Sequence, residues 1–226
     1  MNVVNPDGSR FVVDLNHDRL RFMEKWMFTA WLEKPSGQAR FHVGPVGANE
    51  EILAIENERI KVEVASLGEM GLVSVQNHDE PQTMFLAQGP SHELYTTFEG
   101  TGIPFEAFVD FLGPLEILDT TEGMIARPNG RSWVKIYSIT AVNQVADVAV
   151  VQLFPIDQVL DSLPPGKGRV VAGGELWQIP GSETGQGSAL VLASDSAAAT
   201  ISPVAEAVAL DALTVAEALV VTHQGV

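Results

Sequence analysis

Residues 71–86 read GLVSVQNHDEPQTMFL, two alternating apolar and polar runs on either side of Asn77-His78-Asp79. The same three residues recur at Asn16-His17-Asp18, between FVVDL and RLRF. Asn and Asp side chains bond their own backbone and tolerate left-handed conformations, so such triplets reverse a chain at low cost. Both stretches therefore predict antiparallel hairpins with exposed turns.

More turn signals follow at short intervals. They lie at Lys34-Pro35-Ser36-Gly37, at Asp119–Gly123 and at Pro128-Asn129-Gly130-Arg131. The Asn-Gly pair in the last of these is the strongest short-range hairpin signal. Recurrence at this spacing predicts a mainly β fold: an antiparallel meander forming a sandwich or barrel, with a few short helices and a C-terminal docking segment.

Two segments allow alternative readings or pairings. Residues 19–33 alternate with the period of a strand but also fit a helical stripe, and we favour the strand because a turn follows directly. In ILAIENERIKVEVAS, residues 52–66, a turn at Asn57-Glu58 would pair two strands and bury Ile60, Val62 and Val64 on one face.

The middle of the chain departs from this pattern. Phe105, Phe108 and Leu112 fall near helical spacing, so PFEAFVDFL predicts a short helix whose aromatic side chains lie in the core. The runs LEIL, MIAR, SWVKIYSITAV and DVAVVQLF then predict further strands, and DQVLDSL predicts a helical turn that the following prolines end.

Composition shifts near the C-terminus predict three regions: a β-rich main domain over 1–165, a glycine-rich loop or hinge over 166–188, and an acidic Ala/Val-rich segment over 189–226. Spacing of acidic residues suits a helix over 203–219, whereas the Val and Thr content favours strands. The last segment is too apolar to remain free. It must dock on its own domain or on a neighbouring subunit, and we expect the neighbour.

The net charge of −16 disfavours specific nucleic-acid binding, because like charges repel. Basic residues gather early, from Arg10 to Arg40, and none follows Arg169. Such asymmetry suits head-to-tail packing of copies, or it merely solvates separate faces. With no cysteine, no long apolar run and no signal peptide, we expect a virion or cytoplasmic location and no membrane partner.

Three catalytic motifs fail on inspection. His92-Glu93 lacks the second His of a zincin, since Thr96 stands there. Ser132 lacks the second Gly of a nucleophile elbow, and Gly166-Lys167-Gly168 lacks the residues of a phosphate loop.

For the other candidate residues, a structural explanation is stronger than a functional one. His17 and His78, with Asp18 and Asp79, could form a metal cluster if the two hairpins lay side by side, but turn geometry explains them. The carboxylate pairs Glu99 with Glu106 and Asp119 with Glu122 read as solvated loop charges. We therefore predict no catalytic, metal or cofactor-binding residue and no cofactor.

Two functional hypotheses remain. The first is a non-enzymatic assembly subunit that forms a homo-oligomer within a larger particle, such as a phage tail or head. The alternative is a small-molecule-binding β-barrel or β-sandwich enzyme with a pocket near residues 91–113, where aromatics accompany His92 and Glu93.

Overall fold

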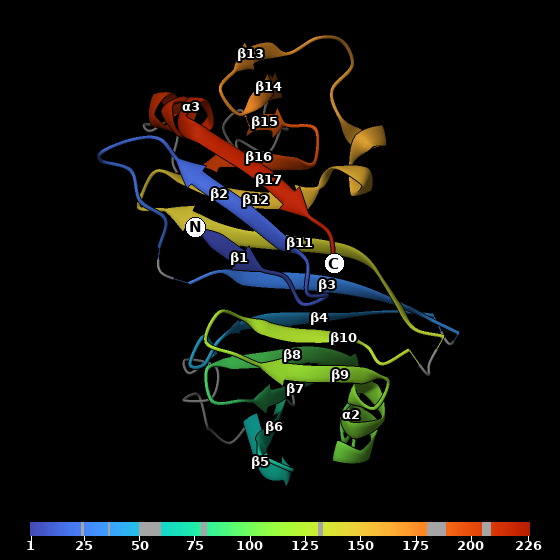
Figure 1. The fold of residues 1–226 in the computed structure, drawn as a ribbon. Coiled ribbons are helices and arrows are strands. Elements are labelled where there is room, and N and C mark those ends of the chain that lie inside the picture. Colours follow the sequence, from blue (N-terminus) through green and yellow to red (C-terminus); the bar gives the residue numbers. More distant parts are fainter. Residues whose placement is uncertain are drawn as a thin grey trace. The chain divides into compact units, whose positions relative to one another are not determined.

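A computed structural model describes residues 1–23, 25–35, 37–49, 60–77, 81–130, 133–179, 189–204 and 209–226. The protein is mainly β with antiparallel strands, which confirms the predicted fold class (Figure 1). Its chain divides into two compact units: unit 1 holds Met1–Asn5, Ser9–Trp26 and Ile139–Val226, and unit 2 holds Pro6–Gly8 and Met27–Ser138.

Unit 1 contains a three-stranded sheet and a second set of hydrogen-bonded strands. Its elements are β1 (Asn2–Val4), β2 (Arg10–Leu15), most of β11 (Lys135–Val145), β12 (Ala149–Pro155), η1 (Ile156–Gln158), η2 (Leu160–Ser162), β13 (Arg169–Val171), β14 (Gly174–Ile179), β15 (Ala189–Ala193), β16 (Ala197–Pro203), α3 (Ala209–Ala218) and β17 (Leu219–Gln224). Strand orders are β1-β2-β17 and β13-β14-β15-β16-β12-β11. The helical turn predicted after β12 is confirmed as η1 and η2.

Small side chains fill the contact between α3 and strands β15 and β16. The buried residues of these three elements are Leu190, Val191, Leu192, Ala193, Ala197, Ala198, Ala199, Ile201, Ala212, Val215 and Ala216. All of these are aliphatic, and about half are alanine. Added volume among closely packed buried side chains is destabilising.

The C-terminal segment docks on its own chain. β16 pairs with β12, and β17 pairs with β2 from Leu219 opposite Leu15 to Gln224 opposite Arg10. Of the two expected docking sites, the described strands occupy the one on their own domain. The segment also contains both a helix and strands, because α3 is followed directly by β17.

The predicted hinge begins with a hairpin rather than a linker. β13 pairs with β14, and β14 with β15, within unit 1, while residues 180–188 lie outside the described part. Gly174 has φ +130°, and a Cβ there would stand 2.0 Å from the Ala193 carbonyl oxygen. Any larger residue at position 174 would have a strained positive φ and a clash with the backbone of β15, so the position requires glycine. The hairpin and the described residues after it belong to unit 1, which holds Ile139–Val226.

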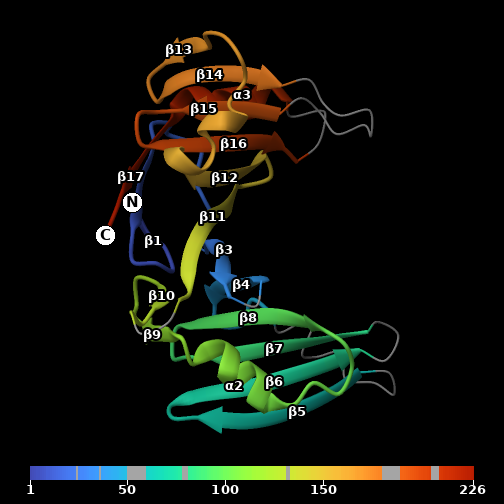
Figure 2. The same ribbon diagram turned by 90° about the vertical axis from the view of Figure 1, so that its right-hand side faces the viewer.

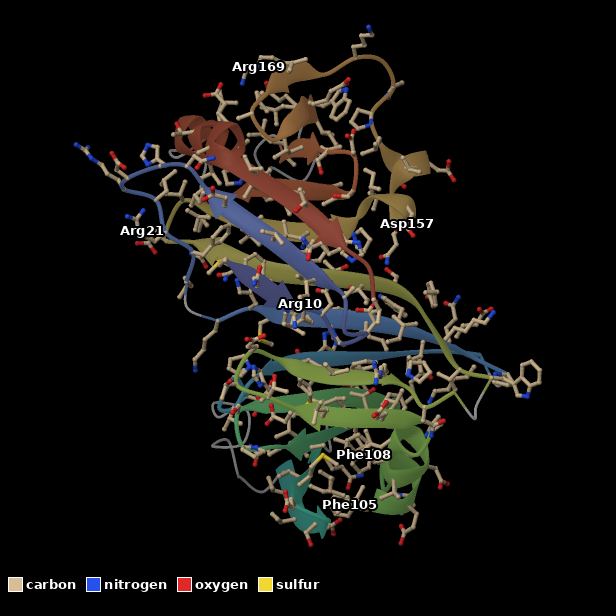
Figure 3. All side chains as sticks on the ribbon, in the orientation of Figure 1. Arg10, Arg21, Phe105, Phe108, Asp157 and Arg169 are labelled. Atoms are coloured by element: carbon tan, nitrogen blue, oxygen red, sulfur yellow. The ribbon has the colours of Figure 1, made fainter. Side chains whose placement is uncertain are left out.

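Within unit 1, basic residues from the first part of the sequence lie together with acidic residues from its last part. β2, with Arg10, pairs with β17 of the acidic segment, and Arg169 forms an exposed ion pair of 2.5 Å with Glu217 of α3. Figure 3 labels both arginines, together with Arg21 near the β2 turn. Arg10, Arg19, Arg21 and Lys25 thus share unit 1 with the late acidic residues, whereas Lys34 and Arg40 belong to unit 2. The mixing of charges within unit 1 weakens the argument for head-to-tail packing by charge.

Unit 2 is a sheet with one helix and a separate hairpin. Its elements are β3 (Met27–Lys34), β4 (Gly37–Pro45), β5 (Ile60–Leu67), β6 (Met70–Asn77), β7 (Gln82–Gln88), β8 (His92–Glu99), α2 (Phe105–Leu112), β9 (Leu115–Asp119) and β10 (Met124–Pro128). The strand order is β3-β4-β8-β7-β6-β5, and β9 pairs with β10. Figure 2 shows α2 lying across one face of this sheet. The predicted helix and the turns after β3 and β9 are confirmed.

Aromatic rings fill the space between α2 and the sheet. Phe85 of β7 stacks on Phe108 of α2 at 5.1 Å between ring centroids, and Phe98 of β8 meets Phe111 edge-on at 5.9 Å. Figure 3 shows Phe105 and Phe108 on the side of α2 that faces the strands. Phe85 and Phe108 are fully buried, so the predicted core role of these aromatics is confirmed.

The first predicted hairpin is wrong. β2 pairs with β1 and β17 on its two edges, and residues 19–22 contribute only a single bridge from Phe22 to Val145. The predicted strand over 19–33 accordingly begins at Met27. The nearby strand β1 and the distant strand β17 occupy the two edges of β2, so no edge remains for a ladder with the residues after its turn.

The turn itself is real. His17 Nδ1 accepts hydrogen bonds from the backbone N–H groups of Arg19 and Leu20, at 3.2 and 3.3 Å. Asn16 and Asp18 are exposed, as expected for a reversal. His17 is thus part of the turn's hydrogen bonding.

The second predicted hairpin is confirmed, since β6 pairs with β7 from Asn77 opposite Gln82. His78 and Asp79 lie outside the described residues, as does the expected turn at Asn57-Glu58. β5 pairs along its full length with β6. Of the residues expected on its buried face, Val62 packs on Val73 and Leu86, whereas Val64 is 75% exposed.

Candidate functional site

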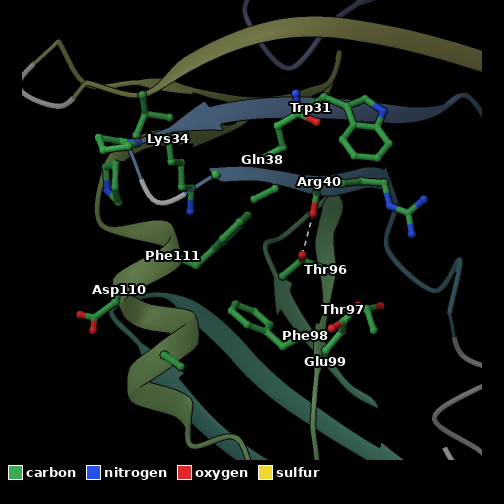
Figure 4. A pocket seen from close by; sticks show the side chains of 16 residues that line it. Trp31, Lys34, Gln38, Arg40, Thr96, Thr97, Phe98, Glu99, Asp110 and Phe111 are labelled. Carbon is green, nitrogen blue, oxygen red and sulfur yellow. Dashed lines mark hydrogen bonds between the residues drawn. The ribbon is translucent and has the colours of Figure 1, made fainter. Parts of the chain in front are cut away.

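A cleft opens in unit 2 where β4 and β8 part. Their ladder runs from Pro45 opposite His92 to His42 opposite Tyr95, and the described strands pair no further. Beyond that point the hydroxyl of Thr96 donates a hydrogen bond of 2.6 Å to the Arg40 carbonyl oxygen (Figure 4). A side chain therefore replaces the ladder bond, and the strands diverge around a cavity of about 840 Å³.

The lining comes from both sides of the divergence and from α2. It consists of Trp31, Lys34, Pro35, Gly37, Gln38, Ala39, Arg40, Thr96, Thr97, Phe98, Glu99, Ala107, Asp110, Phe111, Pro114 and Val134. Pockets that bind small molecules enclose about 300–1,000 Å³ and combine apolar walls with a few polar groups. This cleft has both properties.

Two cations in the lining rest on aromatic rings. The Lys34 Nζ stands 4.0 Å from the centroid of the Phe111 ring, and the Arg40 guanidinium stands 5.4 Å from that of Trp31. Lys34 is half-buried, and burial lowers the pKa of its amine below the usual value. Neither cation has an ion-paired carboxylate among the residues that the structure describes.

Alternation along β3 explains why Lys34 lies there. Phe28, Ala30 and Leu32 are buried at every second position, and Lys34 continues this row at the end of the strand. A cation in the last place of an apolar row is a signal that the sequence contained and that our sequence prediction missed. The expected pocket region, residues 91–113, does contribute Phe98 and Phe111 to the lining.

His42 stands opposite Tyr95 at the end of the β4–β8 ladder. Its Nδ1 is 2.9 Å from the Thr29 hydroxyl, and its ring stacks on Tyr95 at 4.6 Å. Burial first, and then the charge of Arg40, lower the pKa of His42 to about 4. Burial likewise raises the pKa of Tyr95. His42 is therefore neutral at physiological pH, and neither ring of the His42–Tyr95 stack carries a charge.

The predicted pocket residue His92 holds the backbone together and does not line the cleft. Its Nδ1 lies 2.7 Å from Asp119 Oδ1, while Asp119 Oδ2 accepts hydrogen bonds from the backbone N–H groups of Ser91 and His92, at 2.7 and 3.1 Å. A Cβ on Gly89 would stand 2.4 Å from that oxygen. Asp119 thus fixes the β7–β8 turn to the end of β9.

Glu93 is fully buried. Its carboxylate accepts hydrogen bonds from the backbone N–H of Gly47, at 3.2 Å, and from the backbone N–H and side-chain amide of Asn49, at 2.9 and 2.6 Å. Charge-assisted bonds of this kind offset the cost of burying a carboxylate. The residue anchors the loop after β4 and is not among the cleft residues.

The remaining sequence candidates are not brought together. Asp119 is bonded to His92, whereas Glu122 is exposed in the turn that follows. Glu99 lines the cleft, and Glu106 does not. Ser132, like His78 and Asp79, lies outside the described residues.

Among the residues that the structure describes, no group of three His, Asp or Glu side chains could hold a metal ion. No described helix is long and apolar enough to cross a membrane. Comparison with protein-family models, curated proteins and solved structures gives no match to this chain. The argument for function therefore depends on the geometry of the molecule.

Proposed function

We propose that this chain is a non-enzymatic structural subunit that assembles with copies of itself into a larger particle, such as a phage tail or head. Strand β5 supports the proposal. All eight of its residues pair with β6 on one side, and no described strand pairs with its other side. An edge strand of this length, where no other strand covers it, is a template for a strand of another copy.

The side chains of β5 suit such a contact. Val64 is 75% and Leu67 37% exposed, although Val62 two residues away packs on the buried cluster of Val73 and Val75. A second strand beside β5 would continue that cluster and cover Val64. Removing apolar area from water stabilises by about 25 cal/mol per Å².

The sequence of β5 is complementary to itself. In an antiparallel pair of two copies centred on Val62, Val62 stands opposite its own copy, and position 60 stands opposite Val64 on both sides of a two-fold axis. By sequence, each of these paired positions is apolar. The proposed interface is therefore isologous.

A particle larger than a dimer needs a second contact. β13 of unit 1 ends the order of described strands in its part of the sheet, and Val170 on it is 81% exposed. Each copy could then pair with one neighbour through β5 and with another through β13, so that assembly continues beyond a dimer. We propose β13 as the second, weaker contact, because it has only three residues.

Light scattering coupled to size-exclusion chromatography tests the proposal. We expect the wild type to form defined oligomers and Val64→Lys to reduce their mass, because a lysine cannot be buried between two copies without a partner. Leu118→Lys, at a strand position that is 54% exposed, is the matched control and should leave the mass unchanged. A wild type that stays monomeric at all concentrations would refute assembly.

The cleft favours a second candidate function, the binding of a small molecule. It contains residues from the region where the sequence predicted a pocket, and its volume of about 840 Å³ suits such a ligand. This function is compatible with assembly, since the cleft and the β5 edge use different residues.

A further inference from the structure

We propose that the β4–β8 cleft binds an apolar monoanion: a carboxylate joined to a long alkyl or aromatic body. The carboxylate would lie at the Lys34 ammonium, and the body would lie against Phe98 and Phe111. This inference rests on the second candidate function and is independent of assembly.

The position of Lys34 argues for a negative group. Its Nζ lies over the Phe111 ring, half-buried, with no carboxylate partner among the described residues. Desolvating an ammonium without a counter-charge is unfavourable, and the pKa of Lys34 is lowered accordingly. A bound carboxylate would supply the missing counter-charge while the ring continues to contact the cation.

The walls argue for an apolar body. Phe98 and Phe111 meet edge-on, 5.9 Å apart, and Pro114 and Val134 complete the lining on that side. By alternation, Trp31 belongs to the opposite face of the sheet from Leu32. Side chains from both faces therefore belong to the lining of this cavity of about 840 Å³, which is large enough for an elongated ligand.

Charge balance argues against a ligand with several negative charges. Glu99 and Asp110 belong to the lining together with Lys34 and Arg40, so the four charges sum to zero. A nucleotide or another polyphosphate would meet these carboxylates, and the whole chain carries −16. Repulsion of this kind opposes polyanions at long range as well as in the site. A monoanion gains the contact with Lys34 at the smallest cost.

Isothermal titration calorimetry with decanoate and decan-1-ol tests the inference, because the two probes share a chain length and differ in charge. We expect decanoate to bind more tightly than the alcohol. Lys34→Gln should weaken decanoate at least tenfold and leave the alcohol unchanged, whereas Lys34→Arg should retain decanoate binding. Lys135→Gln, an exposed lysine outside the cleft, is the control.

Amide chemical shifts locate the ligand. Decanoate should shift Thr96, Thr97 and Phe111 in wild type and in Lys34→Arg. Equal affinity for both probes in wild type, or equal weakening of both in Lys34→Gln, would overturn the ligand class and leave an apolar pocket. Shifts confined to other residues, or no binding of either probe, would overturn both this inference and the second candidate function, while assembly would be unaffected.

Discussion

Each unit covers a sheet with one helix, but the two contacts use opposite kinds of side chain. In unit 1, α3 packs on β16 with Ala212 and Ala216 buried, whereas in unit 2, Phe108 and Phe111 of α2 meet Phe85 and Phe98. Large rings bury more area for each residue than alanines do, and the cleft of unit 2 borders that ring cluster. The comparison implies that the stability of the helix–sheet contact depends on a few large residues in unit 2 and on many small ones in unit 1.

Truncating one ring should therefore have the largest effect. Phe108→Ala is expected to lower the free energy of unfolding by about 3–5 kcal/mol, because a fully buried ring is lost and a cavity remains. Urea denaturation followed by fluorescence measures the change. Phe105→Ala, at a half-buried position on the same helix, should cost clearly less. Equal costs would show that α2 does not depend on its buried rings.

Enlarging a residue should be the damaging change in unit 1. Ala216→Leu adds volume where α3 meets the sheet, and overpacking of this kind costs about 1–3 kcal/mol. Thermal unfolding should show the loss, while Thr222→Leu, exposed on β17, should change stability by less than about 0.5 kcal/mol. Toleration of leucine at 216 would mean that the small-residue contact is loosely packed.

The carboxylate of Asp119 should contribute less than a core ring. Asp119→Ala leaves two backbone N–H groups and His92 without their acceptor, at a cost of about 1–3 kcal/mol. Glu116→Ala removes only an exposed ion pair with Arg127, expected to be worth below about 1 kcal/mol. The urea concentration at the midpoint of unfolding, measured for each variant, compares the two losses of stability. A similar loss in both would contradict a specific role for Asp119.

The smallest effect concerns pH. Folding lowers the pKa of His42 from 6.5 to about 4, so between these values the unfolded state binds more protons and stability falls as pH falls. Partial exposure reduces the contribution to on the order of 1 kcal/mol. Denaturation at pH 7 and pH 4.5 should therefore show a smaller loss in His42→Gln than in wild type. An identical loss would mean that His42 titrates normally in the fold.

Local chemistry determined much of this structure. The turn at Lys34–Gly37, the turn at Asp119–Gly123 and the helix over 105–112 all follow from residues adjacent in sequence, and each was predictable. The pocket region near residues 91–113 was also predictable as a cluster of aromatics, although its polar partners were not. His92 and Glu93, the expected polar groups, serve to fix turns and loops instead.

Only the tertiary structure decided which strands pair across long stretches of sequence. β2 takes β17 as its neighbour, more than 200 residues away at Arg10 and Gln224, and so forms no ladder with the residues that follow its own turn. The contact of Lys34 on β3 with Phe111 on α2 likewise joins residues far apart in the sequence. Alternation specifies which face of a strand is apolar, but the partner on each edge depends on the collapse of the whole chain, because many strands offer equivalent backbone hydrogen bonds.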